Sequence, residues 1–261
     1  MIKLEYTFKT DTLFKMLFVK YPDLLKRLVA ELLGINYDSI EQFIITNPEM
    51  SPENMGDKFC KLDINMTIDS KRVDLEVQVN DEGDYPDRSL FYWAREYSSA
   101  IGEGDDYSLL PRTIIISIVD FVLFNCTEFQ SEYQPLEINR HTPLTDKMSL
   151  YYYELPKLPA LVNVEYGKEL WLNLFNAETE EELTKIEALE VPVLKQAIKA
   201  FRYVSASPEF REIERLRSKA RHDEAQALKN ARLEEQKKWE SVIADKDALI
   251  TELRAQLDSK Q

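Results

Sequence analysis

Three polar side chains with metal-binding chemistry alternate with apolar ones in the middle of the chain. Asp74, Glu76 and Gln78 take every second position of the run 72–79. The positions between and after them hold Val73, Leu75, Val77 and Val79. Such alternation is typical of a β-strand with one buried face. The polar face then carries carboxylate oxygens, which are the ligands that hard divalent cations prefer.

A second alternating run, 61–68, precedes this one and carries Asp63 at a polar position. The residues between the two runs are Asp69, Ser70 and Lys71, which tolerate turns, so the sequence predicts a β-hairpin. Either register of the hairpin places Asp63 on the carboxylate face.

The turn decides which residue faces Asp63. A two-residue turn at 69–70 puts Asp63 opposite Glu76, and a turn at 70–71 puts it opposite Gln78. Cross-strand neighbours of this kind lie about 5 Å apart at Cβ, and like charges that close repel unless a cation lies between them. The pattern therefore predicts a divalent-metal site, and an ordinary solvated strand face is the alternative.

Helices and further strands must hold this hairpin in place. We expect a helix pair over 11–34, broken at Pro22 and ended by Gly34, and a helix from Arg88 to Ile101. In the latter helix the expected packing stripe is Leu90, Phe91, Ala94, Tyr97 and Ile101.

The β-branched run 112–124 predicts a buried parallel strand, and 150–155 predicts another. Strand, helix, strand order indicates an α/β core of three to five strands. Short helices follow over 167–175, 180–189 and 192–204. We therefore expect a core at 1–160, a helical subdomain packed on it at 161–207, and a long charged helix at 208–261.

Composition excludes several classes of protein. The chain has 261 residues, six glycines without a phosphate-cradling loop, two histidines and two cysteines without metal-finger spacing. These counts argue against P-loop ATPases, dinucleotide enzymes and histidine-dependent nucleophilic catalysis. The absence of a secretory segment and of a long apolar run predicts a cytoplasmic protein that does not span a membrane.

The net charge of −14 lies in residues 1–207, because the segment from Pro208 onwards holds 12 basic and 12 acidic residues. An acidic body argues against broad electrostatic capture of nucleic acid but leaves room for a local basic groove. In the tail, Trp239, Ile243, Ile250, Leu253 and Leu257 fit a coiled-coil seam that Lys246 interrupts, so we expect a homo-oligomer formed through residues 208–261.

An ordered set of short motifs extends over roughly residues 5–210. Its members are Asp11-x-x-Phe14-Lys15-x-x-Phe18, Leu62-Asp63, Asp74-Leu75-Glu76-Val77-Gln78, Arg88 with Tyr92, Tyr107 with Pro111, and Leu144-Thr145-Asp146 leading to Glu154-Leu155-Pro156-Lys157-Leu158. In this set the chain resembles the Rpn-type recombination-promoting nucleases, also described as transposases, of the PD-(D/E)XK nuclease superfamily. The resemblance implies a restriction-endonuclease-like mixed sheet flanked by helices, here with a C-terminal helical extension.

The same resemblance implies a DNA endonuclease that hydrolyses phosphodiester bonds with Mg²⁺, for which Mn²⁺ can substitute. Asp63 and Glu76 would bind the metal, and Gln78 would position the attacking water. The superfamily usually has lysine where this chain has Gln78, and a neutral hydrogen bond is roughly half as strong as a charge-assisted one. The alternative function is a weak or inactive nuclease fold that recruits partners through the C-terminal helix.

Four further residues are accessory candidates, each with a structural alternative. Asp11 is either an additional metal-orienting carboxylate or a helix cap, and Lys15 is either a phosphate contact or a surface lysine. Arg88 and Tyr92, one helical turn apart, either reach the site or serve the packing of their helix.

Overall fold

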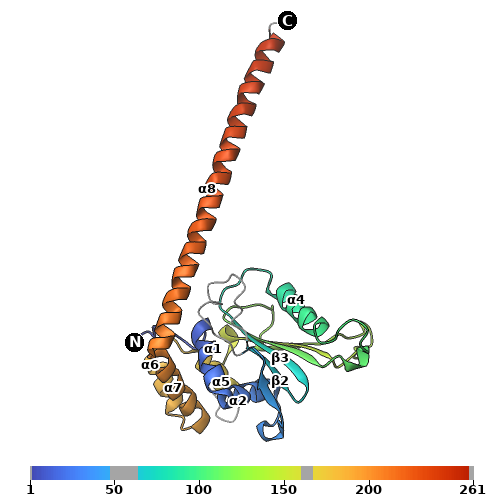
Figure 1. The fold of residues 1–261 in the computed structure, drawn as a ribbon, viewed down its shortest axis with the longest axis vertical. Coiled ribbons are helices and arrows are strands. Elements are labelled where there is room, and N and C mark those ends of the chain that lie inside the picture. The colour runs from blue at the N-terminus through green and yellow to red at the C-terminus, as the bar shows by residue number, and fades with distance from the viewer. Residues whose placement is uncertain (1, 48–63, 160–166, 259–261) are drawn as a thin grey trace. The chain divides into compact units, whose positions relative to one another are not determined.

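The computed structural model describes residues 2–47, 64–159 and 167–258 (Figure 1). The chain divides into two compact units, Met1–Glu212 and Ile213–Gln261. The first unit contains a mixed six-stranded sheet in the order β1-β2-β3-β4-β6-β5. Its strands are β1 (Phe43–Ile45), β2 (Ile64–Ile68), β3 (Lys71–Gln78), β4 (Thr113–Val119), β5 (Gln130–Tyr133) and β6 (Met148–Glu154).

The centre of the sheet is parallel and its margins are antiparallel. β4 pairs in parallel with β3 and β6, whereas β1–β2, β2–β3 and β5–β6 are antiparallel pairs. All seven residues of β4 are buried, as expected for a β-branched strand enclosed on both faces. The predicted mixed sheet is confirmed, but the expectation of three to five strands omitted the short strands β1 and β5.

The hairpin turns at Asp69 and Ser70, because Ile68 pairs with Lys71 across it. Both turn residues have left-handed backbones, with φ of 45° and 66°. The Asp69 carboxylate accepts hydrogen bonds from the backbone N–H groups of Glu41 (3.0 Å) and Gln42 (2.8 Å), and so ties the turn to the segment before β1. This is the register for which the sequence predicts Asp63 opposite Glu76.

One face of the sheet is apolar and is covered by helices α1 (Asp11–Lys20), α2 (Pro22–Leu33) and α5 (Gly167–Asn176) (Figure 1). Pro22 separates the first two helices and Gly34 ends α2 in a left-handed conformation, both as predicted. Ile116 and Leu75 are completely buried on this face. The Tyr153 hydroxyl donates a hydrogen bond to the carbonyl of Leu32 and so joins β6 to α2.

Helix α4 (Tyr85–Ser98) covers the opposite face of the sheet. The predicted packing stripe of this helix is wrong, since Leu90 and Phe91 are 46% and 62% exposed. The inner face instead carries Tyr85, Ser89 and Trp93, the last of which donates its indole N–H to the carbonyl of Thr113 at 3.0 Å. The sheet surface beneath α4 mixes apolar side chains such as Ile115 and Leu150 with the polar groups of Glu76 and Tyr152, so the aromatic and hydroxyl side chains of α4 pack inward.

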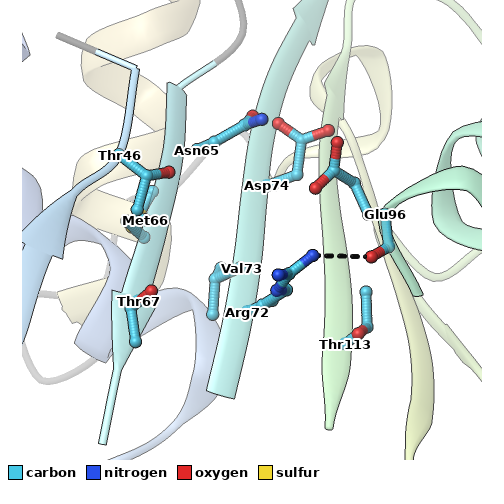
Figure 2. A pocket seen from close by; sticks show the side chains of 9 residues that line it. All are labelled: Thr46, Asn65, Met66, Thr67, Arg72, Val73, Asp74, Glu96 and Thr113. Carbon is cyan, nitrogen blue, oxygen red and sulfur yellow. Dashed lines mark hydrogen bonds between the residues drawn. The ribbon is translucent and has the colours of Figure 1, made fainter. Parts of the chain in front are cut away.

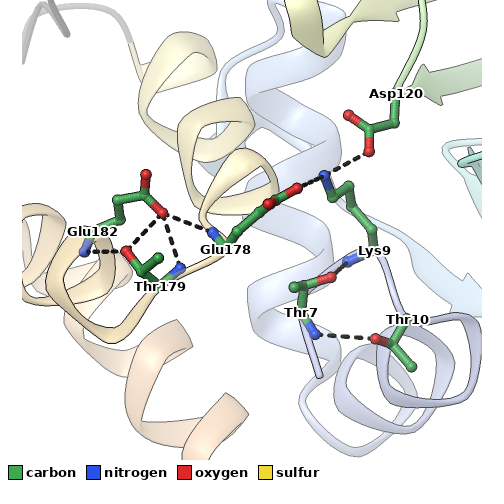
Figure 3. A network of polar contacts seen from close by, with 7 residues as sticks. All are labelled: Thr7, Lys9, Thr10, Asp120, Glu178, Thr179 and Glu182. Carbon is green, nitrogen blue, oxygen red and sulfur yellow. Dashed lines mark hydrogen bonds and ion pairs between the residues drawn. The ribbon is translucent and has the colours of Figure 1, made fainter. Parts of the chain in front are cut away.

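A network of hydrogen bonds and ion pairs connects the N-terminal segment to the residues after β4 and before α6 (Figure 3). The buried ammonium of Lys9 lies 2.6 Å from Asp120, which follows β4, and 3.4 Å from Glu178. Glu178 precedes a capping box in which Thr179 and Glu182 satisfy each other's backbone N–H groups at the start of α6 (Glu180–Glu187). Helix α7 (Pro192–Ser205) follows and packs against α1.

The last helix, α8 (Pro208–Asp258), has 51 residues. Its first turn belongs to the sheet-containing unit, where Phe210 is fully buried and contacts Tyr6 edge to face, with ring centroids 4.7 Å apart. The second unit is the remainder of this helix, on which Trp239, Ile243 and Ile250 are exposed. No helix in the described part of the chain is both long enough and apolar enough to cross a membrane.

Candidate functional site

The polar side of β3 lies beneath α4 and is not an ordinary solvated strand face. Asp74 is only 3% exposed, and Glu76 and Gln78 are half-buried. Parallel pairing places Glu76 in one row with Ser117 of β4 and Tyr152 of β6. Asp74 is therefore not a solvent-facing residue of the strand, because the sheet and α4 enclose its side chain.

Glu76 is held by a residue that the sequence analysis did not identify. The Tyr85 hydroxyl, on the first turn of α4, donates a hydrogen bond to Glu76 Oε2 at 3.1 Å. Burial, and then the nearby Glu76 carboxylate, raises the pKa of Tyr85 well above its ordinary value. The tyrosine therefore stays protonated and donates its hydrogen bond to one carboxylate oxygen of Glu76.

A second contact of the same kind ties α4 to β6. Ser89 and Tyr152 share a hydrogen bond between their hydroxyl groups. Burial raises the pKa of Tyr152. Because Tyr85 and Ser89 are four residues apart, they lie on one side of α4 and together hold its N-terminal half over the Glu76 row. The i, i+4 spacing of these two hydroxyl residues could have indicated the inward face of the helix. The apolar residues on another side of the helix gave the more obvious periodic pattern.

Gln78, at the end of β3, has a fixed side chain. Its amide Nε2 donates to the backbone carbonyl of Asn80 at 2.8 Å. This bond fixes the amide plane and turns the carbonyl oxygen of the side chain away from Asn80. A side-chain oxygen held in this way can accept a hydrogen bond from a water molecule.

Asp63 lies outside the described residues, so its predicted place opposite Glu76 stays a prediction. Within the described ranges, no group of three or more Asp, Glu, His or Cys side chains could hold a metal ion. The donors that are described fit a hard cation, since Glu76 is a half-buried carboxylate with one oxygen anchored by Tyr85. The predicted Asp63 would supply a second carboxylate of the same chemistry.

A cavity of about 230 Å³ opens beside Asp74 on the same side of the sheet (Figure 2). The carboxylates of Asp74 and Glu96 point toward each other across it, and the Asn65 side chain points toward Asp74 (Figure 2). Arg72 forms its floor and donates from Nη1 to the Glu96 carbonyl (2.9 Å) and to Ser99 Oγ (3.0 Å). No local pattern in the sequence indicates this cavity, because its lining residues come from β2, β3, β4 and α4 together.

The four accessory candidates separate onto the two faces of the sheet. Arg88 and Tyr92 lie on α4, on the Glu76 side, and the Arg88 guanidinium stacks 5.0 Å from the centre of the Tyr85 ring. Asp11 and Lys15 lie on α1, in the helical layer of the opposite face (Figure 1). Lys15 is 4% exposed, so the surface-lysine alternative is wrong. Thr10, and not Asp11, occupies the N-cap position of α1.

A mixed six-stranded sheet flanked by helices is consistent with the PD-(D/E)XK nuclease fold. Residues 8–231 match the family described as PD-(D/E)XK nuclease family transposase, and the chain belongs to this family. Members of the family are generally phosphodiester hydrolases that use a divalent metal. No curated protein and no solved structure gives a significant match.

Proposed function

We propose that the protein is a divalent-metal-dependent endonuclease that hydrolyses phosphodiester bonds in DNA. The observation that carries the proposal is the half-buried Glu76 carboxylate, which accepts a hydrogen bond from Tyr85 of α4 and lies two residues before Gln78. Family membership supports the same reaction class.

In this proposal Glu76, Gln78 and the predicted Asp63 each have a defined role. Glu76 and the predicted Asp63 hold Mg²⁺, with Mn²⁺ as a substitute. When bound there, the ion polarises the scissile phosphate and lowers the pKa of a bound water. Gln78 accepts a hydrogen bond from the attacking water and orients it. The water oxygen bonds to phosphorus, the P–O bond to the leaving oxygen breaks, and the water proton passes to solvent.

The direct test uses purified protein and supercoiled plasmid DNA with Mg²⁺, Mn²⁺ or EDTA. We expect metal-dependent nicking by the wild type and none by Glu76→Ala, with an unchanged circular dichroism spectrum. Cleavage by Glu76→Ala at the wild-type rate would contradict the assignment. Calorimetric titration of Mn²⁺ into the wild type and Asp63→Ala tests the metal ligands separately, and equal binding by both proteins would remove Asp63 from the site.

Two observations favour a second candidate, a nuclease fold that recruits partners without efficient cleavage. Gln78 supplies no charge and its amide is already bonded to Asn80, and the net charge of −14 opposes DNA capture. DNA affinity measured over a range of salt concentrations separates the two functions. A nuclease binds DNA with a clear salt dependence, whereas a recruitment module shows no specific DNA binding.

A further inference from the structure

Arg88 uses only part of its hydrogen-bonding capacity. Its Nη1 donates to the Glu82 carboxylate at 3.0 Å, and the guanidinium stacks on the Tyr85 ring. Nε and Nη2 are buried and have no hydrogen-bond partner among the residues that the structure describes. These two nitrogens form one edge of the guanidinium, the side-on fork that binds two oxygens of a carboxylate or a phosphate in parallel.

Burial of these two donor groups without acceptors lowers the stability of the folded protein. Donors that are closed off from water and lack a partner lose their hydration without compensation, and native proteins carry only a few such groups. The ion pair with Glu82 and the stacking on Tyr85 use the charge of Arg88 but leave this edge of the guanidinium unused. The unused edge thus indicates a ligand with two acceptor oxygens.

The position of Arg88 identifies the class of that ligand. Its neighbour in sequence, Ser89, bonds to Tyr152, and Tyr85 beneath it bonds to Glu76. The Arg88 guanidinium thus contacts the ring of the tyrosine that bonds to Glu76, on the side of the sheet that carries the polar row Asp74, Glu76 and Gln78 of β3. This row lacks the lysine charge that is usual in the superfamily, and Arg88 is a fixed cation on the same side of the sheet.

We propose that Arg88 binds a backbone phosphate of DNA through Nε and Nη2 and supplies the positive charge that Gln78 does not. This inference rests on the proposed nuclease function. Glu82 is the counter-ion of Arg88 Nη1 in the free protein, and its side chain is 61% exposed. Ion pairs with an exposed partner contribute little to stability, so a phosphate can displace Glu82 at small cost, and the guanidinium then turns outward and presents the Nε and Nη2 edge to it.

The test measures binding of a fluorescein-labelled DNA duplex by anisotropy in EDTA, over a series of NaCl concentrations. Loss of one phosphate contact lowers the slope of log K against log salt by about 0.9. We expect this decrease for Arg88→Gln. Arg88→Lys should keep the slope but bind more weakly at each salt concentration, because it keeps the charge without the fork. Glu82→Gln should bind DNA more tightly than the wild type.

Arg95→Gln is the matched control, since it removes the same charge from an exposed position of the same helix. An unchanged slope in Arg88→Gln, or an equal decrease in Arg95→Gln, would overturn the proposal. Arg88→Met should have a melting temperature at or above that of the wild type while its slope decreases, and a marked loss of stability would instead indicate a structural role. If wild-type protein neither binds nor cleaves DNA, the proposed function fails, and this inference with it. If the wild type cleaves and Arg88→Gln is indistinguishable from it, only this inference fails.

Discussion

At the scale of single residues, the site depends on how Glu76 is oriented. Its carboxylate lies on a strand, and a hydroxyl from the facing helix determines which way it points. Groups that orient a metal ligand typically change metal affinity by 10- to 100-fold when removed. In the proposed site Tyr85 is such a positioning residue, and Gln78 stands where the resemblance implies a lysine in most of the superfamily.

Tyr85→Phe should weaken Mn²⁺ binding about tenfold or more and leave the protein folded. The change removes the hydrogen bond to Glu76 but keeps the buried ring, so the free energy of unfolding should fall by only about 1 kcal/mol. Calorimetric titration and urea unfolding measure the two effects. Tyr97→Phe is the control on the same helix, since Tyr97 stacks on Trp93 instead. Unchanged Mn²⁺ affinity in Tyr85→Phe would exclude the positioning role.

Gln78→Lys should preserve or raise the rate of plasmid nicking. The lysine ammonium can still donate to the Asn80 carbonyl, and it restores a positive charge beside the scissile phosphate. Gln78→Met, of similar length but without the polar group, should be slower than the wild type. An inactive Gln78→Lys protein with an intact fold and normal metal binding would show that the site requires a neutral residue.

At the scale of elements, the β2–β3 hairpin sets the register on which the site depends. Its turn places two residues other than glycine in left-handed conformations. Such a backbone is unfavourable for most L-residues. Asp69 is compensated by its hydrogen bonds to Glu41 and Gln42, whereas Ser70 is exposed and has the larger φ of the two, 66°.

Ser70→Gly should therefore stabilise the protein by about 0.5 to 1 kcal/mol, since glycine adopts this conformation without strain. Chemical denaturation measures the change. Ser70→Val is the opposing control, and it should destabilise the protein because a β-branched residue tolerates a positive φ poorly. Equal stability of the two variants would mean that the turn backbone is not strained.

At the scale of the whole molecule, most of the long helix α8 forms a unit of its own, separate from the sheet-containing unit. A single helix gains most of its stability by packing against other structure. Beyond the first turn, apolar side chains such as Leu228, Trp239 and Ile250 are exposed along it. The sequence prediction of a homo-oligomer through residues 208–261 is consistent with this exposure and stays a prediction.

Removal of residues 222–261 should leave the sheet-containing unit folded and abolish self-association. The truncation keeps Phe210, which is buried against Tyr6, so it avoids the core defect that deletion from Pro208 would cause. Light scattering of the full-length and truncated proteins gives the oligomeric states. A full-length monomer at micromolar concentration would contradict oligomerisation through the tail and leave a solvated helix as the better account.

The sequence by itself determined the features that depend on local pattern. Alternation gave the hairpin and the polar row with Glu76 and Gln78, Pro22 and Gly34 gave the helix boundaries, and the glycine-poor charged tail gave α8. Each follows from periodicity or backbone restriction within a few residues, which tertiary contacts did not override.

Only the tertiary structure decided the features that depend on distant partners. The inward face of α4, the burial of Asp74 and Lys15, and the bond from Tyr85 to Glu76 all arise where separate segments meet. Apolar residues occur on two sides of α4, and periodicity alone could not rank Leu90 and Phe91 against Ser89 and Trp93. Glu76 and Tyr152 on the sheet select the side of α4 that carries Tyr85 and Ser89, because buried polar groups require partners that only the folded chain supplies.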